Sequence, residues 1–472
     1  MNRTIAQGTA MEALLRPRSV AIVGASDNIQ KIGGRPLHYL LNHGYRGRIF
    51  PVSQRGGPVQ GIASYPGLDA LPEAPDSVIL SVPADAALAQ VEACARIGAR
   101  NAILFTSGFG EMGTEGLRQQ HELVAAARAG GMRLLGPNTI GAANFSCGAI
   151  LSFASIYQDF APQDGAVAIV SQSGAVGASA YALLRQNGVG VRYVCTTGNQ
   201  ADVEVCDFMG AVLVDPSVRL LLLYLEEARD LAALESALAL ARSRGVPVLV
   251  LQAARSDSGA QMAACHTGAA GTRGPQLARL LAHYGCHRVA SLPQLTAGAP
   301  LYLTDSAPAG LGMQVGVISN SGASCVLAAD ACDSLELPLA SLAGSTVAEL
   351  DAMLPAFSRS RNPVDLTAML LTDASLLGRA VDTVLRDPGC TALALSLLAM
   401  AGAGYDVPRF AADTGQAVRA YGKPAVFSSP DPRVRTAFAA EGIAVFASEH
   451  EAIAALQSHA AHRDALQTGV PV

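Results

Sequence analysis

The sequence predicts an α/β protein of three domains, each built around a doubly wound parallel sheet. A chain of 472 residues is long enough for about three domains of roughly 150 residues each. Half of the residues are apolar and 15% are charged, and this composition supports large buried cores. Short apolar runs alternate with segments of helical periodicity, which is the pattern of βαβ units. Because such crossovers are right-handed, a doubly wound sheet follows.

The first domain is predicted to span residues 1–150. We expect strands where the chain is continuously apolar for four to six residues, and helices where apolar residues recur at helical spacing. The expected strands are Val20–Gly24, Ser77–Val82, Asn101–Phe105 and Arg133–Gly136, and the expected helices are Ala86–Ile97 and Gly116–Ala129.

The second and third domains, predicted at residues 160–303 and 313–465, begin alike. One reads Val167-Ala-Ile-Val-Ser-Gln-Ser-Gly-Ala175 and the other reads Val315-Gly-Val-Ile-Ser-Asn-Ser-Gly-Ala323. Each is a strand that leads through a Ser-Gly turn into a helix of small residues, so we predict two copies of one flavodoxin-like domain. The further strands expected in these copies are Val191–Thr196, Leu220–Leu225, Val246–Gln252, Thr391–Leu398 and Pro424–Ser428.

Composition argues against several classes of function. The net charge of −5, without a Lys/Arg cluster, disfavours nucleic acid as a partner. No apolar run approaches the roughly 18 residues of a spanning helix; the best, Leu220–Leu225, stops at Glu226. The nine cysteines are scattered and form no CxxC pair, which is typical of reduced thiols and predicts neither disulfides nor a metal site. We therefore expect a soluble cytoplasmic protein with no membrane association.

Turns rich in glycine and small polar residues follow the strands of the first domain. After the first strand, Gly24-Ala-Ser26 places backbone N–H groups at the edge of the sheet, which suits the phosphates of a nucleotide-like ligand. It is not the dinucleotide fingerprint, because Ser26 stands where GxGxxG has its second glycine. Ser81-Val-Pro83, Thr106–Glu111 and Gly136-Pro-Asn138 follow other strands and are expected at the same carboxyl edge. The alternative is that short βα loops simply require Gly and Pro.

The Ser-Gly turns of the two later domains supply candidate phosphate sites. Ser173 with Gly174, and Ser321 with Gly322, stand at predicted helix N-termini. The dipole and unpaired N–H groups there attract anions by about 0.3–1 kcal/mol per charge. A serine that merely caps its helix is the alternative, and both roles are compatible.

His266 is the candidate nucleophile. It lies in Cys265-His-Thr-Gly-Ala-Ala-Gly271, among small residues rather than the bulky neighbours of a core histidine. A neutral imidazole is nucleophilic near pH 7. Glu226 and Glu227 end a strand of the same domain, and a carboxylate bonded to one ring nitrogen frees the other for attack. A structural role for a lone loop histidine is the alternative.

Over about residues 11–460 the chain resembles the NDP-forming acyl-CoA synthetases, relatives of succinyl-CoA synthetase. The motifs that carry the resemblance occur in the order found in that family. They are Pro17–Ser26, Gly44-Tyr-Arg-Gly47 with Pro51, Ser107-Gly-Phe109, Gly136-Pro-Asn138, Ser171-Gln-Ser-Gly174, Gly198-Asn199, Ala201-Asp202, Tyr224-Leu-Glu226, Ser258-Gly259 ahead of His266-Thr-Gly268, and Asn362-Pro-Val-Asp-Leu366.

The resemblance implies a Rossmann-like CoA-binding domain followed by two flavodoxin-like domains. It implies that His266 is phosphorylated, that Glu226 supports it, and that Ser173 and Gly174 stabilise the phosphoryl group. Acyl-CoA, ADP and phosphate then interconvert with carboxylic acid, CoA and ATP, through an acyl phosphate and a phosphohistidine. The expected CoA contacts are Gly24, Ala25, Ser26, Ser81, Val82, Pro83, Thr106, Ser107, Gly108, Phe109 and Asn138.

The chain departs from the family pattern in a few places. Val52-Ser-Gln54 stands where relatives usually have Val-Asn-Pro, Gln252-Ala-Ala254 replaces a common Lys-x-Gly, and Thr139 replaces a frequent cysteine. No segment resembles an ATP-grasp domain, so ADP or ATP with Mg²⁺ is expected on a separate β-type subunit, in a hetero-oligomer.

Two other functions compete with this one. The first is a CoA- or acyl-CoA-binding regulatory protein without turnover; the His266/Glu226 pair argues against it, because a sensor needs no phosphoryl carrier. The second is an NAD-dependent oxidoreductase, which the missing dinucleotide fingerprint disfavours.

Overall fold

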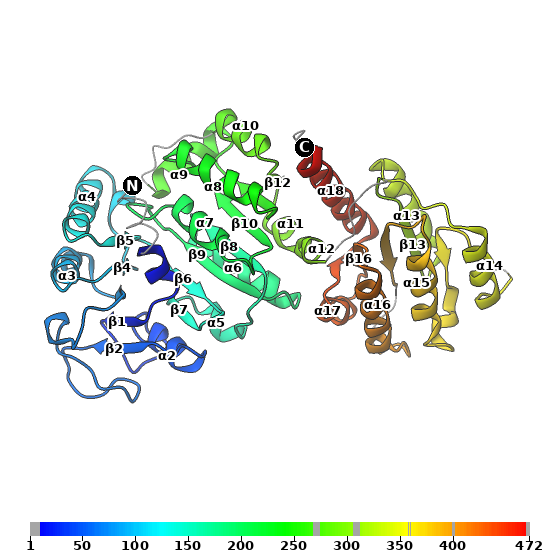
Figure 1. The fold of residues 1–472 in the computed structure, drawn as a ribbon. Coiled ribbons are helices and arrows are strands. Elements are labelled where there is room, and N and C mark those ends of the chain that lie inside the picture. The colour runs from blue at the N-terminus through cyan, green and yellow to red at the C-terminus, as the bar shows by residue number, and fades with distance from the viewer. Residues whose placement is uncertain are drawn as a thin grey trace. The chain divides into compact units, whose positions relative to one another are not determined.

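The computed structural model describes residues 10–267, 274–304, 312–356, 358, 360–398 and 402–468, with the side chains of residues 264–267, 467 and 468 excepted. These residues form two compact units. Unit 1 comprises Met1–Ala182 with Gly190–Leu292, and unit 2 comprises Leu183–Val189 with Pro293–Val472. Unit 1 holds two sheets and unit 2 holds one (Figure 1).

The first sheet is parallel throughout and has the order β2-β1-β3-β4-β5. Its strands are almost fully buried because helices cover them, and α3 and α4 pack side by side (Figure 1). The four strands predicted here are confirmed within two residues, whereas β2 was not predicted. The elements are β1 (Ser19–Val23), α2 (Arg35–Asn42), β2 (Arg48–Val52), η1 (Leu68–Ala70), β3 (Ser77–Leu80), α3 (Ala84–Arg96), β4 (Asn101–Leu104), η2 (Gly110–Met112), α4 (Thr114–Ala129) and β5 (Arg133–Leu135).

The second sheet has the order β12-β11-β10-β8-β9-β6-β7. Five strands are parallel, and the hairpin β6–β7 adds to β9 in the antiparallel sense. This hairpin begins within the range 1–150 and ends at Ser152, yet it belongs to the second sheet. The elements are β6 (Gly141–Asn144), β7 (Ala149–Ser152), α5 (Ile156–Asp159), β8 (Val167–Ser171), α6 (Gly174–Gln186), β9 (Val191–Thr196), α7 (Val205–Leu213), β10 (Leu220–Leu225), α8 (Leu231–Ser243), β11 (Val248–Gln252), α9 (Asp257–Thr267), α10 (Pro275–His283) and β12 (His287–Val289).

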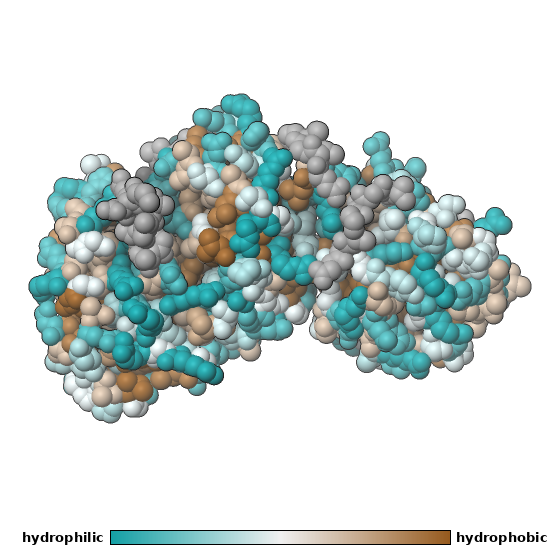
Figure 2. All heavy atoms as spheres, viewed as in Figure 1, coloured by the Kyte–Doolittle hydropathy of each residue, from teal (hydrophilic) through white to brown (hydrophobic). Residues whose placement is uncertain are grey.

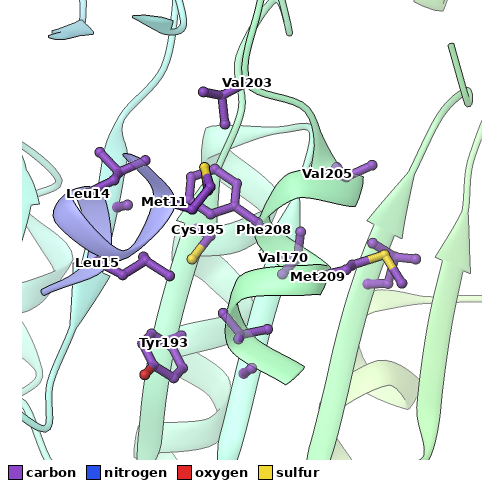
Figure 3. Close-up of a cluster of buried hydrophobic side chains, with 14 of the residues drawn as sticks. Met11, Leu14, Leu15, Val170, Tyr193, Cys195, Val203, Val205, Phe208 and Met209 are labelled. Carbon is purple, nitrogen blue, oxygen red and sulfur yellow. The ribbon is translucent and has the colours of Figure 1, made fainter. Parts of the chain in front are cut away.

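The helical turn that precedes β1 joins the two sheets of unit 1. Met11, Leu14 and Leu15 recur at helical spacing, so they share one face, and that face packs on a cluster that includes Phe208 of α7 and Cys195 of β9 (Figure 3). Each such buried side chain contributes about 1.5–3 kcal/mol. This hydrophobic core reaches both sheets, whereas a second cluster, which includes Val78 and Leu123, lies within the first domain alone.

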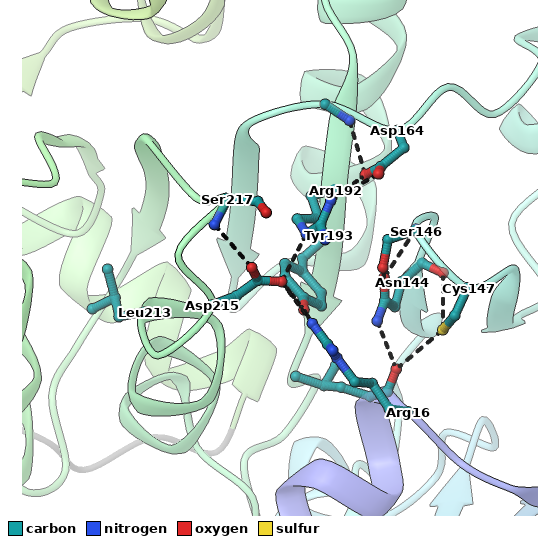
Figure 4. Close-up of polar contacts among 12 residues, drawn as sticks. Arg16, Asn144, Ser146, Cys147, Asp164, Arg192, Tyr193, Leu213, Asp215 and Ser217 are labelled. Atoms are coloured by element: carbon teal, nitrogen blue, oxygen red, sulfur yellow. Dashed lines mark hydrogen bonds and ion pairs between the residues drawn. The ribbon is translucent and has the colours of Figure 1, made fainter.

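A polar cluster reinforces this junction (Figure 4). Arg16 donates to the Tyr193 hydroxyl at 3.0 Å and to Asp215 Oδ2 at 2.7 Å, and Arg192 Nε reaches the same oxygen at 2.7 Å. Burial opposes ionisation of Asp215, but the backbone N–H of Ser217, the Arg192 guanidinium and the Tyr193 hydroxyl all donate to it and hold its pKa well below the usual range. The segment before β1 is thereby tied to the second sheet.

Unit 2 contains a parallel sheet of order β14-β13-β15-β16-β17. Asn362, in the motif Asn362–Leu366, accepts from Val317 N and donates to the carbonyls of Val315 and Ala340, so it fastens the start of this sheet. The elements are α11 (Leu292–Ala297), α12 (Ala299–Leu303), β13 (Val315–Ser319), α13 (Gly322–Ser334), α14 (Gly344–Met353), β14 (Val364–Asp365), η3 (Thr367–Leu371), α15 (Leu376–Arg386), β15 (Ala392–Ser396), α16 (Val407–Tyr421), β16 (Ala425–Ser428), α17 (Pro432–Ala440), β17 (Ala444–Phe446) and α18 (Glu449–Thr468).

The five parallel strands of each sheet follow one order. Numbered along the chain within each sheet, they run 2-1-3-4-5, the flavodoxin-like order, with the switch point between the first and third strands. The α/β fold and the likeness of the second and third domains are thus confirmed. In the part of the chain that the structure describes, no helix combines the length and apolarity that crossing a bilayer requires.

Candidate functional site

The switch point of the first sheet is shaped by glycine. Gly24 ends β1 with φ +83°, and a Cβ added there would lie 2.3 Å from the carbonyl oxygen of Ser81, at the end of β3. A Cβ on Gly33 would lie 2.0 Å from the carbonyl oxygen of Gly24. The loop from Gly24 to Gly33 therefore folds closely over the β1/β3 crevice, in a conformation that side chains would prevent.

A cleft of about 1030 Å³ opens at this crevice. Six of the predicted CoA-contact residues line it, and they come from the turns after β1 and β3. They are Gly24, Ala25, Ser26, Ser81, Val82 and Pro83. The volume lies at the upper end of the range of small-molecule sites.

Two cations that sequence reasoning missed also line the cleft. Lys31 follows β1, Arg55 follows β2, and neither forms an ion pair with the described residues. Arg96 lies in the cleft too, but it is paired with Asp69 at 3.0 Å. Arg55 follows Val52, the last residue of β2, so recognising that strand in the sequence would have placed Arg55 at this edge of the sheet. The cleft thus offers two unpaired cations to an anionic ligand.

The other predicted CoA contacts, Thr106–Phe109 and Asn138, do not line this cleft. Thr106 Oγ1 donates to the carbonyl of Val82 at 2.5 Å, and Asn138 N donates to the carbonyl of Thr106 at 2.9 Å. These turns therefore continue the same sheet edge, away from the β1/β3 crevice.

Glu111 and Asn199 link that edge to the second sheet. Glu111 Oε1 accepts from Gly108 N at 2.6 Å, and its Oε2 accepts from Asn199 Nδ2 at 2.5 Å. Asn199 Oδ1 accepts from Asn138 Nδ2 at 3.1 Å. Burial acts to raise the pKa of Glu111, but the Gly108 N–H and the Asn199 amide outweigh it and lower that pKa below its usual range. Glu111 was not singled out from the sequence.

Glu226 is held at the end of β10 with one oxygen unused. Its backbone N–H donates to Gln172 Oε1, and its Oε1 accepts from the Tyr224 hydroxyl at 2.9 Å. The residue is only 8% exposed, and its buried Oε2 has no hydrogen-bond partner among the described residues. A buried carboxylate oxygen in this state costs free energy until a donor reaches it.

The helix α6 begins beside this carboxylate. Ser173 N donates to Ser171 Oγ at 3.1 Å, and Gln172 connects the turn to Glu226 and Glu227. A Cβ on Gly174 would lie 2.7 Å from Ile140 Cγ2, so the helix start sits tightly against the chain that enters β6. The first-turn N–H groups of α6 thus lie on the edge that carries Glu226.

His266 falls in the stretch whose side chains the structure does not describe. The helix that contains it, α9, ends at Thr267 and lies against η2, the short helix of Glu111. The His266–Glu226 pairing therefore stays a prediction.

Ser321 and Gly322 belong to unit 2. Gly322 begins α13, and a Cβ there would lie 3.1 Å from Asp365 Oδ2. A carboxylate so close to the helix N-terminus repels a second anion. The phosphate role predicted for these two residues is thus disfavoured by their surroundings.

A second hollow in unit 1 carries none of the predicted residues. It measures about 700 Å³, and its apolar walls come from the helical turn of Met11 and from α7 and α8. Hydrophobic spheres show at the surface of this part of unit 1 in Figure 2, and Val214 is 64% exposed there.

Comparison with known proteins gives two family models. One is a CoA binding domain, matched by residues 18–144, and the other is a succinyl-CoA ligase like flavodoxin domain, matched by residues 164–302. The chain is 31% identical to the alpha subunit of the ADP-forming acetate–CoA ligase I of Pyrococcus furiosus, over 76% of this chain and 77% of that subunit.

Longer relatives match as well. The ADP-forming acetate–CoA ligase I of Archaeoglobus fulgidus is 33% identical over 77% of this chain, but over only 51% of its own length. The chain thus spans about half the length of that relative. Among solved structures, a dinucleotide-forming acetyl-coenzyme A synthetase 1 of Ca. Korarchaeum cryptofilum, in complex with phosphate and ADP, superposes with a TM-score of 0.85 at 25% identity, over 98% of both chains.

Proposed function

This chain belongs to the family of ADP-forming acyl-CoA synthetases, and we propose that it is the α-type part of an acid–CoA ligase that binds CoA and carries a phosphohistidine. The buried Oε2 of Glu226, which has no hydrogen-bond partner among the described side chains, is the observation that supports this most. A histidine N–H would satisfy it and would leave the opposite ring nitrogen free as the nucleophile. We assign His266 to that role, since it lies at the end of α9 in the same domain.

The proposed reaction has three steps. A phosphate oxygen attacks the thioester carbon, the C–S bond breaks, and CoA leaves with formation of an acyl phosphate. The His266 ring nitrogen then attacks phosphorus, the P–O bond to the acyl group breaks, and the carboxylate leaves. A terminal oxygen of ADP finally attacks phosphorus, the N–P bond breaks, and ATP forms with release of His266. Phosphoryl transfer depends chiefly on position and electrostatic stabilisation, and the α6 N-terminus with Ser173 and Gly174 would supply both.

CoA would occupy the cleft at the β1/β3 switch point. Its pyrophosphate would approach the backbone at Gly24–Ser26, a turn that passes so close to the Ser81 carbonyl that a side chain on Gly24 would displace it. Lys31 and Arg55 are free to neutralise the phosphates, because neither is engaged by a described carboxylate. We assign Thr106–Phe109 and Asn138 to the end of CoA that approaches the second domain.

The acyl substrate is proposed to be a small carboxylic acid. Relatives are described as ligases of acetate and of 4-hydroxybutyrate, and another as a trans-feruloyl-CoA synthase. ADP and Mg²⁺ are assigned to an ATP-grasp β-type subunit, which the alpha-subunit relatives suggest as the partner in a hetero-oligomer.

The test is to mix the chain with an ATP-grasp subunit and labelled ATP. We expect a base-stable, acid-labile phosphate on the peptide that contains His266, and none after His266→Ala. Equal labelling of that peptide in the His266→Ala protein would refute the assignment. Good CoA binding with no labelling by any partner would favour a regulatory CoA-binding protein instead.

A further inference from the structure

Glu111 stands between the CoA-binding turns and the second domain. It follows β4 within η2, and each of its carboxylate oxygens accepts one hydrogen bond. Gly108 N donates from the turn Thr106–Phe109, and Asn199 Nδ2 donates from the turn after β9. Asn199 is 1% exposed, so the second bond is shielded from water and is strong for that reason.

Asn199 extends the connection in three directions. It accepts from Asn138 Nδ2 at 3.1 Å, donates to Gln120 Oε1 at 3.0 Å, and its backbone N–H donates to the carbonyl of Pro137 at 3.0 Å. The turns that contain Gly108, Asn138 and Asn199 are therefore held together through one amide and one carboxylate.

The same network continues to the turn of Glu226. Arg229 Nη1 donates to the carbonyl of Gln200 at 2.7 Å, and Arg229 Nε donates to Glu227 Oε1 at 3.3 Å. Gln172 donates to the carbonyl of Glu227 at 2.8 Å and accepts from Glu226 N. A continuous set of contacts thus runs from the Gly108 turn to the carboxylate proposed to support the histidine.

The geometry assigns to Glu111 the role of a positioning residue, which holds the Thr106–Phe109 turn in register with the second domain so that CoA meets the phosphoryl-transfer site. The inference rests on the function proposed above. A role as general base does not fit, since donors occupy both oxygens and a low pKa makes the carboxylate a weak base. The position of η2 against α9 puts this contact beside the helix of His266.

Glu111→Gln, in the full chain, tests the role. The new NH₂ group must face either the Gly108 N–H or the Asn199 amide, both donors, so one contact turns repulsive. We expect CoA binding, measured by calorimetry, to weaken about tenfold or more. Labelling of His266 from ATP, with the partner subunit present, should stay within about twofold, because that step needs no CoA. Glu115→Gln is the matched control, since Glu115 pairs only with exposed neighbours on α4, and it should change neither readout.

The double variant Glu111→Gln with Asn199→Asp exchanges donor and acceptor across the contact. The glutamine amide can then donate to the new carboxylate while its oxygen accepts from Gly108 N, so CoA binding should recover in part. Unchanged CoA binding in Glu111→Gln overturns the proposal. Equal losses of CoA binding and His266 labelling would also overturn it, because they mean a merely structural role. Failure of the wild-type chain to bind CoA would instead refute the proposed function.

Discussion

Glu226→Gln should make the protein more stable and less active at the same time. The carboxylate is 8% exposed, and its Oε1 accepts a hydrogen bond from Tyr224 while Oε2 has no described partner. Glutamine keeps the shape and can keep the bond from Tyr224 through its amide oxygen. What it removes is a buried charge with an unsatisfied oxygen.

The magnitude follows from these contacts. An unsatisfied buried group costs about 1–3 kcal/mol and more when it is charged, so the uncharged NH₂ group that replaces Oε2 carries a smaller cost. Exchanging a charged for a neutral acceptor weakens the bond from Tyr224 by about 1 kcal/mol. The net gain in the free energy of unfolding is therefore about 1 kcal/mol. For a unit of this size it raises the midpoint of thermal unfolding by about 2 °C. Phosphorylation of His266 should slow about 100-fold or more, since the amide no longer stabilises the imidazolium or fixes the tautomer.

Calorimetric melting and ATP-dependent labelling of the same preparations measure the two effects. Glu227→Gln is the matched control: Glu227 is also buried, but Arg229 donates to it at 3.3 Å. Its substitution should destabilise the protein by about 1–3 kcal/mol, because a buried carboxylate loses its pairing with the Arg229 guanidinium. Unchanged labelling of His266 in Glu226→Gln would refute the assignment of that oxygen to His266, whatever the change in stability.

Other perturbations have equally definite outcomes. Gly24→Ala should weaken CoA binding at least tenfold in calorimetry, because a Cβ would meet the Ser81 carbonyl at 2.3 Å and a residue at φ +83° is strained by about 1–2 kcal/mol; unchanged affinity would remove the crevice from the site. Lys31→Ala and Arg55→Ala should each lower CoA affinity severalfold at low salt and reduce its salt dependence, and affinities unaltered at every salt concentration would count against phosphate contacts. Asp215→Asn should lower the free energy of unfolding by about 2 kcal/mol at pH 7. Since the folded pKa of Asp215 lies below the unfolded value, its stabilisation is present above about pH 4 and fades as pH falls further, so urea melts of the two proteins should converge in acid; a constant difference would contradict this.

Much of the fold was accessible from the sequence because parallel strands buried on both faces are continuously apolar. Val167–Ser171 and Leu220–Leu225 have the predicted bounds. The strand β2 (Arg48–Val52) escaped because it begins with an exposed arginine and contains a proline, which interrupts the apolar run. The hairpin β6–β7 escaped for another reason. Its strands are four residues each, and only pairing with a distant strand, β9, decides which sheet they join.

The residues of the candidate site also divide into those that the sequence revealed and those that it did not. Motif residues such as Gly24 and Glu226 were identified locally, since glycine in a turn and a carboxylate after a strand are visible in the sequence. Lys31, Arg55 and Glu111 were not, because a cation in a loop or an acid in a short helix is usually a solvated surface residue. Their importance depends on what lies opposite. Lys31 and Arg55 line a cleft in which no described carboxylate pairs with them, and Glu111 faces the Asn199 amide.

The second and third domains share a strand order, but the surroundings of their Ser-Gly turns differ. Both copies place a serine and a glycine at the start of a helix at the switch point. In the second domain that helix start is linked through Gln172 to Glu226, whose Oε2 has no partner among the residues that the structure describes. In the third domain, Asp365 lies close to Gly322, and Glu449 accepts from Ser324 and Ser396. Two carboxylates near one helix N-terminus already satisfy its positive end, so a phosphoryl group gains little there. The second and third domains therefore share a strand order but differ in the chemistry that their helix N-termini can support. We assign phosphoryl binding to the second domain because of the side chains around its helix start.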